Sequence, residues 1–274
     1  MVSKDQRRRQ LAREKYLRQQ QRRTQQRSRA RKRNAAIAGV VAVVVAAGAA
    51  AWASTGLGGD KKTTADAAST ASATPTSKAP DPCAKPAAGS PGTKQWKSEP
   101  SMSIDSHATY TMDLGTTCGD IKLKLDAAGA PHTVNSFKFL ADQGYFDHTR
   151  CHRLTTSNIY VLQCGDPTGS GQGGPGYTLP DENLKDPAIA KGTYPAGTVA
   201  MANTGQPHTG GSQFFLVYKD SPLPASYTPF GSIDADGMKV LQKIAGAGED
   251  DSNNPGDGKP NATVVINKAT VTQS

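Results

Sequence analysis

Residues 110–125 read YTMDLGTTCGDIKLKL, and this stretch decides the class of fold. Apolar and polar side chains alternate from Tyr110 to Leu114 and again from Ile121 to Leu125. Since successive side chains of a strand point to opposite faces, each run predicts a strand with one buried face. The turn-forming residues GTTCGD between the runs predict that the two strands pair as a β-hairpin.

Further strands and two helices follow this hairpin along the chain. Val134, Phe137 and Leu140 repeat at helical spacing before Gly144, and residues 236–245 show a second amphipathic pattern. More strands are expected at residues 151–155, 159–164, 197–202, 213–218 and 263–271. Many antiparallel strands with two helices and Gly-rich connections predict a mainly β barrel and not a parallel α/β sheet.

The folded domain is expected to occupy only residues 101–274 of the 274-residue chain. Residues 55–100 are rich in Thr, Ala, Ser and Pro, which predicts a disordered linker. Residues 1–34 carry fourteen Lys and Arg against two acidic residues, a balance of +12. Because the whole chain carries +9, everything after residue 34 carries −3. The basic charge belongs to the tail, and the domain is no candidate for specific nucleic-acid binding.

Residues 35–53 form a nineteen-residue run without a charged side chain, which is long enough to cross a bilayer as a helix. Residues 35–54 are therefore predicted as a single transmembrane helix. Basic residues 31–33 precede it, so the N-terminus is expected in the cytoplasm and the domain outside the cell membrane. A cleaved signal peptide is the rival interpretation, but the basic and apolar regions are both longer than signal peptides have. The tail is interpreted as a solvated topogenic segment, with binding to anionic lipid as the alternative.

Four cysteines lie in the outer part of the chain: Cys83, Cys118, Cys151 and Cys164. An extracytoplasmic location permits disulfides, but four cysteines allow three pairings and the sequence does not choose among them. Cys151 and Cys164 flank an expected hairpin, so they could pair across its strands. A zinc site that also uses His148 and His152 is the alternative, but its spacing matches no common zinc module. No metal or cofactor is expected.

Several segments match one family in order and spacing: CHRL at 151–154, VLQCGDP at 161–167, GSGQGGPGY at 169–177, PDEN at 180–183, VAMANTG at 199–205, GSQFFLVY at 211–218 and TPFG at 228–231. Together they resemble the cyclophilin family of peptidyl-prolyl cis–trans isomerases, over residues 107–274. The resemblance implies a closed eight-stranded antiparallel barrel, capped by two α-helices, with a peptide groove on its outer face.

The resemblance also implies the site residues. The family's catalytic arginine falls on Arg153. Substrate-binding positions fall on Gln163, Tyr160, Val161, Ala202, Asn203, Gln213, Phe215, Leu223 and Tyr227. The expected partner is a proline-containing polypeptide outside the membrane, bound by a monomer that assists the folding of exported proteins. The alternative is a non-catalytic binding module or holdase chaperone that uses the same groove.

Isomerisation needs no nucleophile or general base, because no bond is made. In the twisted transition state the proline nitrogen regains a lone pair that can accept a hydrogen bond. Arg153 carries a permanent charge and directional donors that can form this bond. Since the bond exists only in the transition state, it lowers the barrier of about 18–20 kcal/mol.

The chain departs from the family pattern near this arginine. Arg153 and Gln163 are ten residues apart, two more than is usual in the family, so the pocket position falls on either Tyr160 or Ile159. Pro222 and Leu223 stand where the family has its cyclosporin-contacting tryptophan, and Tyr227 replaces a histidine. These changes imply weak cyclosporin binding and an altered pocket rim.

Overall fold

The computed structural model describes residues 80–274, and the predicted hairpin lies within them. Strands β1 (Tyr110–Thr116) and β2 (Gly119–Leu125) pair antiparallel, with Tyr110 opposite Leu125. Met112 and Leu123 are fully buried, while Lys122 and Lys124 between the buried positions of β2 are exposed. The alternation therefore predicted both the strands and the face that packs on the core.

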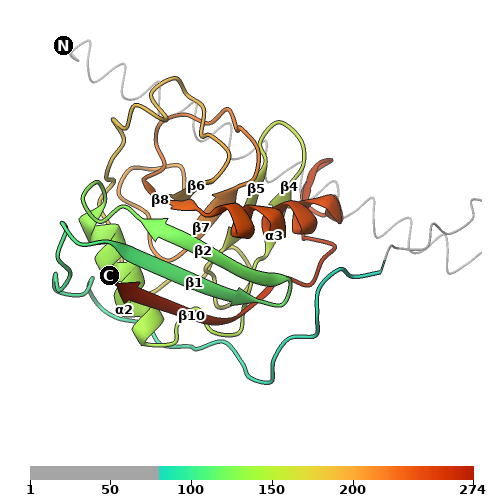
Figure 1. Cartoon of the computed structure of the whole chain (residues 1–274), viewed down its shortest axis with the longest axis horizontal. Helices are drawn as coiled ribbons and strands as arrows, with labels where there is room; N and C mark the ends of the chain where they lie inside the picture. Colours follow the sequence, from blue (N-terminus) through green and yellow to red (C-terminus); the bar gives the residue numbers. More distant parts are fainter. Residues whose placement is uncertain (1–79) are drawn as a thin grey trace, which may run out of the picture. The chain divides into compact units, whose positions relative to one another are not determined.

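One antiparallel sheet contains all the strands of residues 80–274, in the order β3-β10-β1-β2-β8-β6-β7-β5-β4-β9. Figure 1 labels every strand of this sheet except the short edge strands β3 and β9. The remaining strands are β3 (Thr149–Arg150), β4 (Arg153–Thr155), β5 (Val161–Cys164), β6 (Thr198–Met201), β7 (Phe214–Val217), β8 (Pro229–Ile233), β9 (Asp257–Gly258) and β10 (Val265–Gln273). The sheet is curled, as a barrel is, which confirms the mainly β fold. It differs from the predicted closed eight-stranded barrel, because no strand pairing within residues 80–274 joins its edges β3 and β9.

Two helices, α2 (Pro131–Asp142) and α3 (Ala235–Gly246), complete the domain, as the periodicity predicted. Helix α2 packs near β10 and α3 lies along β2 (Figure 1). Phe137 of α2 is fully buried, and its ring centroid lies 5.5 Å from that of Phe214 and 4.6 Å from that of Phe230. This aromatic cluster joins the helix to strands β7 and β8.

The N-terminus of α2 has no cap from its own sequence, since the capping position is Ala130. Glu182, from the PDEN segment about fifty residues further along the chain, supplies the capping carboxylate. Its two carboxylate oxygens accept the backbone N–H groups of His132 at 3.0 Å and Thr133 at 2.8 Å. A carboxylate there satisfies free N–H groups and faces the positive end of the helix dipole. The segment therefore ties the loop after the Gly-rich segment to α2.

We expect Glu182→Ala to lower the free energy of unfolding by about 1–2 kcal/mol, the usual cost of losing a helix cap. Urea unfolding followed by circular dichroism would measure this loss. Asp142→Ala at the other end of α2 is the matched control and should change stability by less than about 0.5 kcal/mol. Equal stabilities of the Glu182 variant and the wild type would show that the carboxylate does not act as a cap.

Residues 80–100 pack against the domain, although the sequence predicted a disordered linker up to residue 100. The backbone N–H of Ala84 donates to the carbonyl of Thr117 at 2.8 Å. The ring of Trp96 packs edge-on against Phe139, with centroids 5.1 Å apart. A single aromatic residue in a polar stretch produces no periodicity, so the sequence pattern did not reveal this docking segment.

The structure also selects one of the three cysteine pairings. Cys83 bonds Cys118 and so joins residues 80–100 to the β1–β2 turn. Cys151 bonds Cys164 beside the β4–β5 hairpin. Since all four thiols are consumed, Cys151 and Cys164 are not zinc ligands.

The predicted basic tail, the predicted transmembrane helix and the first part of the predicted linker lie outside the described residues. Within residues 80–274, no helix has the length and apolar character needed to span a membrane.

Candidate functional site

A small hollow of about 160 Å³ opens on the outer face of the sheet. Its lining consists of Arg153, Ile159, Val161, Gln163, Ala202, Asn203, Phe215, Leu223 and Tyr227. Phe215 and Phe214 are neighbours on β7 and face opposite sides of the sheet. Phe214 belongs to the main core, whereas Phe215 joins a separate outer cluster with Val161 and Tyr194. The hollow therefore has an apolar floor on the side of the sheet away from the core.

Arg153 forms the polar rim of the hollow and is held in a fixed orientation. Its Nε and Nη2 donate to the two carboxylate oxygens of Asp257, at 2.8 and 2.7 Å. Its Nη1 donates to Oε1 of Gln163 at 3.2 Å. A guanidinium has five N–H donors, so two remain for another acceptor. The hydrogen bonds with Asp257 raise the pKa of Arg153 and lower the pKa of Asp257, which keeps the pair ionised.

The side-chain amides of Gln163 and Gln213 extend the hydrogen-bond network from Arg153 to the Gly-rich loop. Nε2 of Gln163 donates to Oε1 of Gln213 at 2.9 Å. Nε2 of Gln213 donates to the carbonyl of Gly173 in the Gly-rich loop, also at 2.9 Å. Arg153 and Gln163 meet because they are paired residues on β4 and β5. The orientation of the guanidinium is thus coupled to the position of the loop.

Sequence reasoning missed Asp257. It lies 104 residues from Arg153, on the two-residue strand β9 that pairs with β4. The surrounding residues, NPGDGKP, read as a turn, and an acidic residue in a turn is ordinarily a solvated one. Only the pairing of β9 with β4 brings this carboxylate to the arginine.

Tyr227 forms one wall of the hollow, and its backbone is fixed by buried Tyr194. The Tyr194 hydroxyl donates to the Tyr227 carbonyl at 2.7 Å and accepts the Tyr227 N–H at 3.1 Å. Burial raises the pKa of Tyr194 to about 12, so this hydroxyl stays protonated. The ring centroids of Tyr227 and Phe215 lie 5.4 Å apart, nearly perpendicular. Tyr227 thus lies at the edge of the hollow, and its contact with substrate, which the family resemblance implied, stays a prediction.

The prediction that Tyr160 lines the pocket differs from the structure, in which Ile159 takes that place. The backbone N–H of Tyr160 donates to the Ser221 hydroxyl at 2.9 Å. Its ring packs edge-on against Tyr218, and the Lys219 ammonium lies 4.4 Å from its centroid. The longer connection between Arg153 and Gln163 therefore turns Tyr160 away from the hollow.

A wider groove of about 1120 Å³ adjoins the hollow and shares Gln163, Ala202 and Asn203 with it. Gln213, predicted to hold a peptide main chain, lines this groove and not the hollow. The lining also includes Gln95 and Glu99, from the segment that was predicted to be a linker. Every predicted site residue except Tyr160 therefore lines one of these two connected spaces.

The Gly-rich loop that borders the groove is organised by one buried carboxylate, Asp166. It accepts backbone N–H groups at 2.6–3.1 Å from the loop residues Thr168, Ser170, Gly171, Gln172 and Gly173. Burial by itself raises the pKa of Asp166, but the hydrogen bonds outweigh it and hold the pKa below the ordinary 3.8. Asp166 therefore positions Gly173, to which Gln213 donates.

We expect Asp166→Asn to destabilise the domain by about 2–3 kcal/mol at pH 7, because one amide oxygen cannot replace a charged acceptor of so many N–H groups. The pKa of Asp166 is lower in the folded state, so its stabilisation is complete above pH 3.8 and is lost as pH falls through the folded pKa. Urea unfolding from pH 7 to pH 2.5 should show the variant and the wild type converging below pH 3.8. Exposed Asp120→Asn is the control and should track the wild type throughout. A pH-independent difference would contradict this role of the charge.

Comparison with known proteins shows which family and which relatives this chain resembles. The model of the family described as cyclophilin type peptidyl-prolyl cis-trans isomerase/CLD matches residues 111–271. A probable peptidyl-prolyl cis-trans isomerase B from Mycobacterium leprae is 49% identical over 58% of this chain and 56% of its own length. The protein of the same name from Mycobacterium tuberculosis is 50% identical, over 58% of this chain and 53% of its own. The chain thus spans little more than half the length of these relatives.

Solved structures show a corresponding likeness. The crystal structure of a Cryptosporidium parvum cyclophilin type peptidyl-prolyl cis-trans isomerase superposes with a TM-score of 0.51 and 28% identity. It covers 61% of this chain and 99% of its own. A structure of that protein in the presence of the dipeptide Ala-Pro gives the same TM-score at 29% identity, over 60% of this chain and 99% of its own.

Proposed function

Because the chain belongs to the cyclophilin-type peptidyl-prolyl cis–trans isomerase family, we propose that its outer groove catalyses rotation about Xaa-Pro peptide bonds. The observation that carries the proposal is the orientation of Arg153 at the rim of a hollow with an apolar floor. Two of its N–H groups have no acceptor among residues 80–274, and Phe215 lies among the apolar residues of the same hollow. The structure of a relative determined with Ala-Pro supports a proline ring as the group that the hollow accepts.

The proposed mechanism uses one set of contacts that forms when the peptide binds and one hydrogen bond that forms only in the transition state. The proline ring enters the hollow against Phe215, while Gln163 and Asn203 hold the flanking main chain. As the amide twists, conjugation is lost and the proline nitrogen regains its lone pair. A free N–H of Arg153 then donates to that nitrogen. Asp257 keeps the guanidinium in place, so little reorganisation is needed when the bond forms.

An assay of the full chain on a short peptide that contains one Xaa-Pro bond tests this proposal. We expect exchange between the cis and trans resonances to become faster in the presence of substoichiometric protein, with unchanged cis and trans populations. Peptide binding without faster exchange would overturn the catalytic proposal. That outcome would support the alternative of a proline-binding module or holdase, favoured by the occupation of three of the five Arg153 donors.

We further propose that residues 35–53 anchor the chain in the cell membrane, with the domain outside, where it assists the folding of exported proteins. The uncharged run and the basic residues before it support this orientation. Two disulfides in the domain also fit an oxidising compartment. Carbonate extraction of cell membranes should leave the wild type bound and release a Val44→Arg variant. Extraction of both proteins would overturn the anchor.

A further inference from the structure

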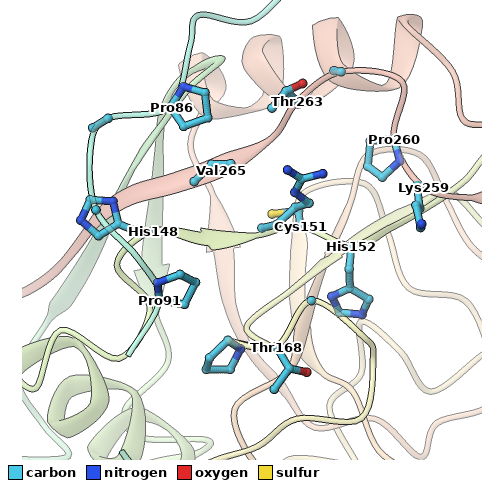
Figure 2. Close-up of a pocket in the computed structure, with 16 residues that line it drawn as sticks. Pro86, Pro91, His148, Cys151, His152, Thr168, Lys259, Pro260, Thr263 and Val265 are labelled. Carbon is cyan, nitrogen blue, oxygen red and sulfur yellow. The ribbon is translucent and has the colours of Figure 1, made fainter. Parts of the chain in front are cut away.

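A second cleft, of about 490 Å³, lies apart from the residues assigned to catalysis (Figure 2). It is formed by residues 86–91, the β3–β4 segment, the start of the Gly-rich loop and residues 259–265. Figure 2 shows His148 beside Pro86 and Pro91, with His152 and Lys259 on the other side. The volume is within the range of small-molecule sites.

The lining of this cleft is cationic. Among the described residues, its only ionisable side chains besides the two histidines are Arg150 and Lys259, and none of these residues contributes a carboxylate to the lining. Both cations are exposed, and neither takes part in an ion pair with any residue of the region 80–274. The cleft therefore presents two positive charges without an ion-pair partner among residues 80–274, although the Asp250 carboxylate lies close enough to Lys259 to offset part of its charge.

Carboxylates near the cleft are engaged elsewhere. Asp81 accepts the backbone N–H groups of Cys83 and Thr263, each at 3.0 Å. Asp250 accepts the N–H of Lys259 at 2.8 Å. Asp166 is enclosed by the N–H groups of the Gly-rich loop. These carboxylates stabilise the backbone segments around the cleft, and none of them is among its lining residues.

The two imidazoles supply the most specific observation. Nδ1 of His148 and both ring nitrogens of His152 are buried, and none has a hydrogen-bond partner among residues 80–274. Buried polar atoms are nearly always hydrogen-bonded, so these three nitrogens of two cleft-lining residues indicate a missing partner. Because the nitrogens have almost no exposed surface, the rings must turn toward the cleft to reach a ligand in it. Burial, the largest cause, lowers the pKa of His152, so at neutral pH the ring offers one N–H donor and one acceptor.

We propose that this cleft binds a small phosphate-bearing ligand, with the phosphate between Arg150 and Lys259 and accepting a hydrogen bond from an imidazole N–H. An arginine fork matches two phosphate oxygens, and a lysine adds a point charge. The prolines among the lining residues, including Pro86, Pro91 and Pro260, provide apolar walls for an attached organic group. The same chemistry would recognise a soluble phosphate ester or a lipid headgroup.

The test follows the imidazole nitrogens of the full chain, labelled with ¹⁵N-histidine and kept in neutral detergent micelles. Addition of glycerol 3-phosphate should shift the His148 and His152 resonances saturably, which identifies a soluble ester. A shift only when phosphatidylglycerol is added to the micelles identifies a headgroup. Neither histidine lies among the basic residues 1–34, so binding of phosphate there is not what the shifts report. Because His152 also interacts with Arg153, a shift of His148 together with His152 is required to assign binding to the cleft.

The variant Arg150→Gln/Lys259→Gln should raise the Kd at least tenfold. The matched variant Lys191→Gln/Lys239→Gln removes the same charge from exposed positions that do not line the cleft and should stay within twofold. Because Arg150 and Lys259 are exposed, their replacement should leave the fold intact, and circular dichroism checks this. The proposal is overturned if neither probe shifts the two histidines, or if Arg150→Gln/Lys259→Gln binds as the wild type does.

Discussion

Replacement of Arg153 by alanine should lower kcat/KM for prolyl isomerisation by about 10²–10³-fold, the usual cost of losing one transition-state donor. The fall should appear in kcat, because the ground-state amide nitrogen has no lone pair to accept the bond. Arg153→Lys should recover little activity, since an ammonium cannot hold the paired geometry that Asp257 imposes. Peptide exchange by NMR measures the rates of all three proteins.

The controls separate catalysis from folding. Lys122→Ala removes an exposed positive charge on β2 and should keep wild-type kcat/KM. Removal of Arg153 leaves Asp257 without its main partner, so the unfolding midpoint of each variant should be measured alongside its activity. A wild-type kcat in Arg153→Ala would refute transition-state donation by this residue.

Loss of the Cys83–Cys118 disulfide should be among the most destabilising changes in the domain. This bond closes a loop with a sequence separation of 35 residues, which corresponds to about 4 kcal/mol of chain entropy. The Cys151–Cys164 bond spans only 13 residues and corresponds to about 3 kcal/mol. Guanidinium unfolding of the Cys83→Ser/Cys118→Ser and Cys151→Ser/Cys164→Ser proteins would measure both losses.

The two losses should also differ in their functional consequence. Cys83 tethers the segment whose residues Gln95 and Glu99 line the wide groove. Loss of this disulfide should therefore raise KM for longer peptides, which extend into the wide groove, more than KM for a substrate of dipeptide length. Wild-type stability of the Cys83→Ser/Cys118→Ser protein would mean that the noncovalent contacts of Trp96 and Ala84 are enough to hold the segment.

The sequence by itself determined most of the elements and the faces that they bury, although it did not predict strands β3, β8 and β9. Alternation in β1 and β2 and helical spacing in α2 each report a local period. The period indicates which side chains face the core, and this does not depend on which other element covers that face. The family resemblance then identified Arg153, Gln163 and Phe215 within these elements.

Only the tertiary structure showed which residues contact one another across distant segments of the chain. Asp257, Glu182 and Trp96 each act on a segment far from them in the chain, and none lies in a periodic pattern that marks its role. The choice of Ile159 over Tyr160 depended on how a loop of unusual length docks against Ser221. The physical reason is the same in each case. Burial leaves a repeating signal along the chain, whereas a contact between two loops depends on their positions in space and leaves none.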